Sequence, residues 1–214
     1  MLKINFLGDS ITQGARASSE EKNYVSLVGK MLNAVSRNYG ISGTRIAIQR
    51  VPSLKPYHDK YFASRVKDMD KDADLVFVFG GTNDYGHGDA DFGNIGDKEP
   101  TTFCGAVDDL INELLKYYDQ QKIIFILPIH RVNETNPYGS AKTIPGKTLP
   151  EYRDAMTTIL NNRGIKILDI VEQFGKAEDN PLIADGLHPN DMGHQKLAEL
   201  IVDYIKSQIK IQDL

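Results

Sequence analysis

DLVFVFGG, residues 74–81, is an apolar run that follows one aspartate and is closed by two glycines. An uninterrupted apolar run predicts a strand buried on both faces, as in the parallel sheets of α/β proteins. KIIFILPI, residues 122–129, repeats the pattern. Between the two runs, one stripe at helical spacing comprises Phe103, Val107, Leu110, Ile111, Leu114, Leu115 and Tyr118. The order is therefore strand, helix, strand, for which a right-handed crossover is the default.

The same alternation continues on both sides of these segments. Apolar residues at helical spacing predict a helix at 22–36: Tyr24, Leu27, Val28, Met31, Leu32 and Val35. Further strands are expected at 2–7 and 165–170, and further helices from Pro150 to Gly164 and over about 191–209. The segment 37–73 is less regular, with a short edge strand near 38–41 and one or two helices. The pattern predicts a parallel sheet covered by helices on both faces.

Length and composition bound the class of protein. A chain of 214 residues with 41% hydrophobic residues favours a single domain, 1–214. The formal net charge of −4 argues against a nucleic-acid partner, which selects basic faces. Cys104 is the one cysteine, so no internal disulfide can form and a reducing compartment is permitted.

The apolar runs are short. The N-terminal run is too brief for a signal peptide, and the longest run, 123–129, is far below the roughly 18 residues that suggest a membrane span. We therefore expect a soluble, cytoplasmic protein with no membrane span.

Two polar segments stand out, at 85–100 and 131–148. Both follow predicted strands, so both are expected as loops at the carboxyl edge of the sheet. Ligands of open α/β sheets bind at that edge. The second segment contains AKTIPGKT, residues 141–148, which is similar to a phosphate-binding loop. Such a loop must join a strand directly to a helix, and this one does not, so nucleotide binding is not expected.

A serine follows the first predicted strand directly, in GDSITQG at residues 8–14. A sharp turn here would expose the Ser10 hydroxyl at the carboxyl edge of the sheet. A serine after Gly-Asp is also a common helix N-cap or turn residue. The serine alone therefore leaves both roles open.

A second polar element, DGLHP at residues 185–189, precedes the last predicted helix. In a tight turn, the Asp185 carboxylate can accept from Nδ1 of His188 while Nε2 points outward. That arrangement would make Ser10, His188 and Asp185 a nucleophile, a base and an orienting group. A loop histidine that merely follows an aspartate is the simpler alternative.

Metal binding is the rival interpretation of this region. His188, Asp191 and His194 are spaced three apart, but Pro189 breaks any helix that they would share. No further ligand is evident, and Cys104 lacks the partners of a structural zinc site. We expect no metal and no cofactor.

Acyl transfer also needs hydrogen-bond donors aimed at the developing oxyanion. NYGISG at residues 38–43 follows the predicted edge strand, and its last glycine, Gly43, could bring a backbone N–H close to a ligand. GGTND at residues 80–84 closes the central strand and places the Asn83 amide at the same edge. Taken alone, Gly43 is expected to be a turn glycine and Asn83 a capping residue.

Taken together, the four segments resemble the SGNH hydrolases, also called the GDSL esterase/lipase family. The resemblance runs in the family's order from Gly8 to Pro189, with isoleucine where many members have leucine in the first block. It implies that Ser10 is the nucleophile and, through its N–H, an oxyanion donor. Gly43 and Asn83 are the other implied donors, and Asp185 and His188 complete the triad. The implied fold is a three-layer α/β/α sandwich, flavodoxin-like, with about five parallel strands.

The resemblance implies a serine esterase that acts through an acyl-enzyme on a small-molecule ester. The polar loops favour a short acyl or acetyl group on a carbohydrate or small alcohol. The alternatives are a longer-chain lipase, lysophospholipase or thioesterase, and a non-catalytic glycan- or acyl-binding module. Asp9, Tyr85 and His130 are candidate substrate-lining residues, with Asp9 also expected to shape the turn through backbone amides. The sequence predicts no oligomeric state.

Overall fold

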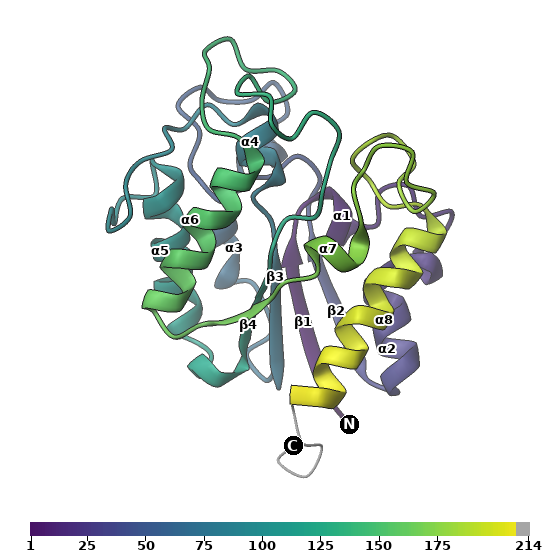
Figure 1. Cartoon of the computed structure of the whole chain (residues 1–214). Coiled ribbons are helices and arrows are strands. Elements are labelled where there is room, and N and C mark those ends of the chain that lie inside the picture. The colour runs from purple at the N-terminus through teal and green to yellow at the C-terminus, as the bar shows by residue number, and fades with distance from the viewer. Residues whose placement is uncertain (209–214) are drawn as a thin grey trace.

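The computed structural model describes residues 1–208. Five parallel strands form one sheet in the order β2-β1-β3-β4-β5 (Figure 1). The strands are β1 (Lys3–Gly8), β2 (Val35–Gly40), β3 (Leu75–Phe79), β4 (Ile123–Ile126) and β5 (Lys166–Leu168). The predicted parallel, flavodoxin-like sheet is confirmed.

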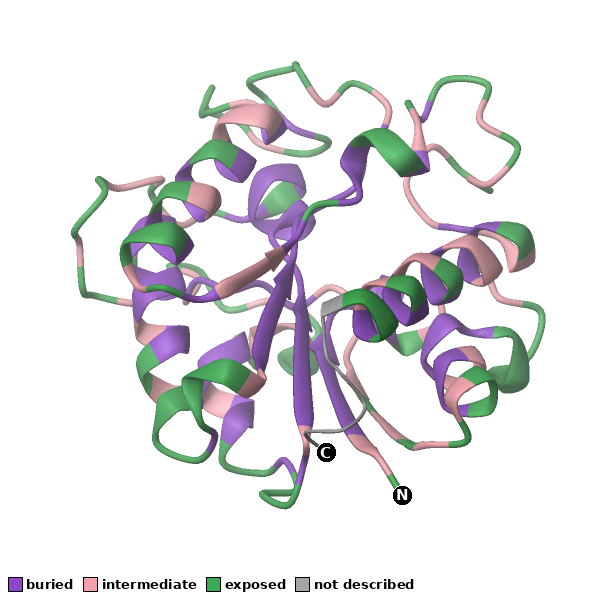
Figure 2. Ribbon diagram, turned by 60° about the horizontal axis from the view of Figure 1, so that its bottom comes forward, coloured by how far each residue is buried: buried purple, intermediate pink, exposed green. Residues whose placement is uncertain are grey.

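Helices cover both faces of the sheet. On one face lie α2 (Tyr24–Leu32) and α8 (Asp191–Gln208), and on the other α3 (Phe62–Val66), α5 (Phe103–Leu115) and α6 (Leu149–Asn162) (Figure 1). Side chains of β3 alternate between the two cores: Val76 and Val78 pack on the α3, α5 and α6 side, whereas Phe77 and Phe79 pack on the α2 and α8 side. The central strands β1, β3 and β4 are buried along most of their length, whereas the edge strands β2 and β5 are partly exposed (Figure 2). This is the three-layer arrangement expected from the apolar runs.

The predicted helix at 22–36 is too long at both ends. A 3-10 turn, η1 (Glu20–Lys22), precedes α2, and the helix stops at Leu32 because Asn33 adopts a left-handed conformation with φ 49°. Val35, the last residue of the predicted stripe, begins β2 instead, so the edge strand starts earlier than 38–41. Val35 matches the helical spacing by chance, because α2 has already ended at Leu32.

The predicted loop at 85–100 begins with helix. The short α4 (Thr82–His87) includes Tyr85, which is buried. The Tyr85 hydroxyl donates to the carbonyl oxygens of Asn133 at 2.5 Å and Asn136 at 3.0 Å. These long-range partners order a segment whose glycines and aspartates predicted an exposed loop.

The remaining elements are short and lie mainly in the connections. They are α1 (Ser10–Gln13), α7 (Val171–Phe174), η2 (Pro56–Asp59) and η3 (Gln120–Lys122). Residue 209, the last of the predicted C-terminal helix, lies outside the described residues. Within 1–208, no helix has the length and apolar character needed to cross a membrane.

The strand order determines where a ligand can bind. The chain runs from β1 to β2 on one side, and β3 lies on the other side of β1. Open α/β sheets bind ligands outside the carboxyl ends of the strands at this reversal. In Figure 1, α1 and α4 stand at that end of the sheet, opposite the N-terminus.

Candidate active site

Ser10 is placed by the turn between β1 and α1. Asp9 caps α1: its Oδ1 accepts from the backbone N of Ile11 at 3.0 Å, and Ser10 is the first helical residue. Gly8 is required because a Cβ there would lie 1.9 Å from Oγ1 of Thr12. The tight turn therefore sets the serine at the carboxyl end of β1, as the sequence predicted.

The three residues proposed from the sequence as a triad are brought together. The Ser10 hydroxyl lies 2.9 Å from Nε2 of His188. Nδ1 of His188 lies 3.1 Å and 3.0 Å from the two carboxylate oxygens of Asp185. A carboxylate only accepts, so Nδ1 carries the proton and Nε2 is free to accept from Ser10. The tautomer is therefore the one that a general base needs.

Asp185 is held in its ionised form. Its Oδ1 also accepts from the backbone N of His188 at 2.9 Å, and its Oδ2 accepts from Nε of Arg16 at 2.8 Å. Partial burial alone would raise the pKa of Asp185, but the bonds from the His188 backbone, Arg16 and the His188 ring outweigh burial and hold the pKa well below its usual value. Sequence inspection missed Arg16, because nothing local relates residues 169 positions apart.

The two other predicted oxyanion residues also face this site. Gly43 has φ +75°, a conformation that favours glycine, and lines the same hollow as Ser10 and His188. Nδ2 of Asn83 donates one hydrogen to the carbonyl of Thr44 at 3.0 Å. The amide group has a second hydrogen available for a ligand.

A hydrogen-bond chain that the sequence did not predict orients the Asn83 amide. Oδ1 of Asn83 lies 3.1 Å from Nε2 of His87, and Nδ1 of His87 lies 3.1 Å from Nη1 of Arg45. Since Oδ1 can only accept and Arg45 can only donate, His87 is neutral with its proton on Nε2. Desolvation, followed by the charge of Arg45, lowers the pKa of His87 to about 4.

Asp84, next to Asn83, fastens the Gly43 segment to α4. Its carboxylate oxygens accept from the backbone N of Ile46 at 3.0 Å and of Ala47 at 2.9 Å. Burial is the largest influence on Asp84 and raises its pKa to about 6, against the lowering effect of these two bonds. One short helix therefore holds both the Asn83 side chain and the backbone that follows Gly43.

These groups surround a hollow of about 540 Å³. Its lining comprises Ser10, Ala15, Arg16, Ser42, Gly43, His58, Asn83, His87, Arg131, Ser140, Leu187 and His188.

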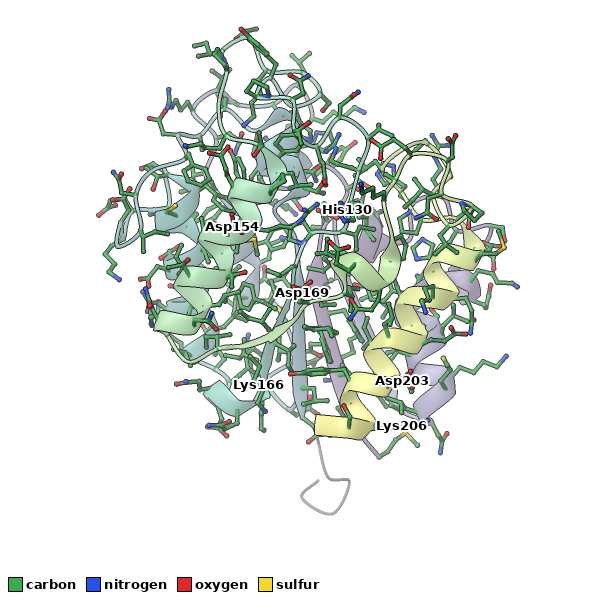
Figure 3. The ribbon with its side chains drawn as sticks, in the orientation of Figure 1. His130, Asp154, Lys166, Asp169, Asp203 and Lys206 are labelled. Atoms are coloured by element: carbon green, nitrogen blue, oxygen red, sulfur yellow. The ribbon has the colours of Figure 1, made fainter. Side chains whose placement is uncertain are left out.

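The three candidate substrate-lining residues are not part of this lining. Asp9 and Tyr85 are buried, Asp9 in the turn and Tyr85 in α4. His130 is turned toward Glu134, 2.8 Å from its Nδ1, and lies beside α7 in Figure 3. Asp9 and Tyr85 lie close to Ser10 and Asn83 in sequence, and His130 follows a predicted strand, but neighbouring side chains along a turn or helix point in different directions.

The rival metal cluster does not assemble within residues 1–208. Both ring nitrogens of His194 face backbone groups, Nδ1 the Tyr24 N–H at 3.3 Å and Nε2 the Ala15 carbonyl at 3.1 Å. Asp191 accepts from the backbone N and hydroxyl of Ser18. These residues support the turn after α1 and the start of α8.

The fold and site together define a class: serine hydrolases built on a flavodoxin-like parallel sheet. Residues 6–196 match the family model described as GDSL-like lipase/acylhydrolase. The chain therefore belongs to the GDSL-like lipase/acylhydrolase family, a family of carboxylic ester hydrolases.

Solved structures share the fold. A protein from Lactobacillus plantarum is 28% identical, with a TM-score of 0.79 over 97% of this chain and 98% of that one. The lipase/acylhydrolase from Enterococcus faecalis is 22% identical, with a TM-score of 0.67 over 98% of each chain. A possible lipase from Chitinophaga pinensis is 22% identical, with a TM-score of 0.68 over 97% of this chain and 99% of that one. No sequence among the curated proteins matches the chain.

Proposed function

We propose that this acylhydrolase cleaves short-chain esters through an acyl-enzyme on Ser10. The observation that carries the proposal is the continuous chain from Ser10 Oγ through His188 to Asp185. Nε2 of His188 takes the hydroxyl proton as Oγ attacks the ester carbonyl, and Asp185 stabilises the imidazolium that forms. His188 then protonates the leaving alcohol. Water, activated by the same base, releases the acid and regenerates Ser10.

Three donors are proposed for the oxyanion of the tetrahedral intermediates: the backbone N–H of Ser10, the backbone N–H of Gly43, and the second hydrogen of Asn83 Nδ2. Ser10, Gly43 and Asn83 line one hollow, and the Asn83 amide is oriented by Thr44 and His87. Donors fixed in advance need no reorganisation when charge develops.

The lining of the hollow favours a short acyl group. Ala15 and Leu187 supply its apolar side chains, and the other side chains are polar. Each CH₂ of an acyl chain contributes about 0.8 kcal/mol only when it is buried against apolar surface. Two such side chains can pack against a short acyl group, but they do not extend along a dodecanoyl chain. Acetyl or a similar group on a carbohydrate or small alcohol fits this lining better.

One observation favours a second candidate, a medium-chain esterase. A separate hollow of about 370 Å³ shares His87 with the first and includes Val51, Phe92, Ile144 and Tyr152 in its lining. These apolar side chains could receive a longer acyl chain that passes His87. Chain-length preference therefore separates the two candidates.

The test is hydrolysis of p-nitrophenyl esters from C2 to C12 by wild type and Ser10→Ala. We expect the highest kcat/KM at C2 to C4, and a fall in kcat of at least about 10⁴-fold in the variant. A maximum at C8 to C12 would favour the second candidate.

Ser26→Ala, on α2, is the matched control, because Ser26 is not among the residues that line the hollow and alanine is a good helix former. A serine-directed phosphonate should label wild type at Ser10 and leave Ser10→Ala unlabelled. Absence of both hydrolysis and labelling in folded wild type would instead support a non-catalytic binding module.

A further inference from the structure

Arg131 is a buried cation in the wall of the catalytic hollow. Its residue is 7% exposed, yet it lines the same hollow as Ser10 and His188. Nη1 donates to the carbonyl of Thr82 at 3.1 Å and to its hydroxyl at 3.3 Å. Within the part of the chain that the structure describes, Nε has no hydrogen-bond partner.

The guanidinium is held in a defined place. It lies over the Tyr85 ring, with Cζ 5.4 Å from the centroid. It also occupies space that a side chain at Gly86 would take, since a Cβ there would be 2.7 Å from Nη1. A rigid guanidinium in a fixed position is well suited to bidentate recognition of a carboxylate or phosphate.

The charge of Arg131 is not matched by a direct ion pair. None of the ion pairs among residues 1–208 includes it. Asp185 is already bound by Arg16 and His188. Burial raises the pKa of Asp9 to about 7, so that carboxyl is only partly ionised at neutral pH. Buried cations are normally paired, so an unpaired one beside a nucleophile points to a ligand.

The rest of the lining is compatible with an anion. Arg16 is the second arginine of the hollow, and no aspartate or glutamate of the described chain lines it. This contrasts with the chain as a whole, whose formal net charge is −4. Because Arg16 is already paired with Asp185, the unpaired positive charge of the hollow is that of Arg131, and it favours an anionic substrate over a cationic one.

We propose that Arg131 is a specificity residue that binds an anionic group, carboxylate or phosphate, carried by the ester substrate. This inference rests on the proposed function, because it places the anion beside the ester that Ser10 attacks. The anion can belong to the acyl group, as in a dicarboxylic half-ester, or to the alcohol. Both sources present the same chemistry to the guanidinium.

Two pairs of matched esters distinguish these sources at pH 7.5. Mono(4-nitrophenyl) glutarate against 4-nitrophenyl pentanoate places the anion on the acyl side. 4-Acetoxybenzoate against its methyl ester places it on the alcohol side. A charge-assisted bond to a buried guanidinium should favour the anionic member of one pair about 10- to 100-fold in kcat/KM, mainly through KM.

The variants are Arg131→Gln and Arg131→Lys, with Lys55→Gln as a control that removes an exposed cation. We expect Arg131→Gln to lose most of the anionic preference, measured as the ratio of kcat/KM for the anionic ester to kcat/KM for its neutral partner, so that any general loss of activity cancels. Arg131→Lys should keep part of the preference, because it retains the charge but loses the fork. Lys55→Gln should keep all of it.

The proposal is overturned if wild type shows no anionic preference in either pair. This measurement uses wild type alone and does not depend on the folding of a variant. It is also overturned if folded Arg131→Gln or Arg131→Lys keeps the full preference. Hydrolysis of the neutral esters by wild type, lost in Ser10→Ala, would meanwhile support the proposed function. The two proposals can thus fail separately.

Discussion

At the scale of single residues, the Asn83 amide shows how the site is pre-organised. One hydrogen of Nδ2 is committed to the Thr44 carbonyl and Oδ1 to His87, so the direction of the remaining N–H is set before any ester binds. An unrestrained amide would have to be oriented during the reaction. The proposed oxyanion donor is therefore oriented by hydrogen bonds to other residues of the protein.

Asn83→Ala should lower kcat by about 10²- to 10³-fold and change KM little, because the lost bond forms mainly in the transition state. The measurement is kcat for a short ester at saturation. Asn161→Ala, an exposed change on α6, is the control for the substitution itself. A kcat near that of wild type in folded Asn83→Ala would remove this donor from the mechanism.

His87→Ala should lower kcat by a smaller factor, because it frees the amide without deleting it. If His87 acts through Asn83, the double variant should be no slower than Asn83→Ala alone. Additive losses would show that His87 contributes independently. The same ester assay on wild type, the two single variants and the double variant decides between these outcomes.

The proposed triad can be recognised in the sequence, whereas the residues that support the site cannot. Ser10, Asp185 and His188 stand in short local patterns, and the structure brings them together. Arg45 and His87 are separated by 42 positions, and neither belongs to a recognisable pattern. Long-range hydrogen bonds between side chains leave no periodic signal in one sequence.

At the scale of elements, the buried strands were predicted well and the boundaries less well. β3 and β4 are uninterrupted apolar runs, and such runs are typical of strands buried on both faces. The end of α2 and the helix α4 depend instead on a left-handed Asn33 and on the partners of Tyr85. Neither a left-handed cap residue nor a long-range hydrogen bond can be predicted from local composition.

α4 also couples stability to activity through Asp84. Asp84→Asn places an NH₂ group against one of two backbone N–H donors, so we expect a loss of about 1–3 kcal/mol in the free energy of unfolding. The Gly43 segment would also shift, and a misplacement of about 1 Å can cost up to about 100-fold in kcat. Urea unfolding and ester turnover measure the two effects.

Asp89→Asn is the matched control. Asp89 accepts from two consecutive backbone N–H groups, Arg50 at 2.8 Å and Val51 at 2.9 Å, but it is exposed. Water can replace a lost bond there, so both effects should be smaller. Equal losses in the two variants would show that burial of Asp84 is not what matters.

At the scale of the whole molecule, the site lowers the stability of the fold because it buries polar groups. Asp9 and Asp84 are buried on adjoining elements of the carboxyl edge, and Oδ2 of Asp9 has no hydrogen-bond partner within residues 1–208. The two apolar cores beneath them supply the compensating stability. Buried polar groups with unsatisfied hydrogen-bonding atoms are typical of functional sites.

The global consequence is a pH-dependent stability that Asp9→Asn should alter. Burial, the largest influence, raises the pKa of Asp9 to about 7, so the folded protein holds a proton that the unfolded chain loses near pH 4. The contribution of Asp9 to stability is therefore fully present below pH 4 and declines as pH rises to about 7. Relative to Asp9→Asn, wild type should lose up to about 1.4 kcal/mol per pH unit over this range.

Asp169→Asn separates this burial effect from the turn itself. Asp169 accepts from the backbone N of Val171 at 3.1 Å, the same local bond that Asp9 makes with Ile11, but from the exposed position labelled in Figure 3. Urea unfolding of the three proteins at pH 5, 6, 7 and 8 measures the slopes. Of these two aspartates, only Asp9 is buried. The difference in free energy of unfolding between wild type and Asp9→Asn should therefore change more with pH than the difference between wild type and Asp169→Asn. If the free energies of unfolding of the two variants depend equally on pH, the Asp9 carboxyl does not cause the pH dependence of wild type.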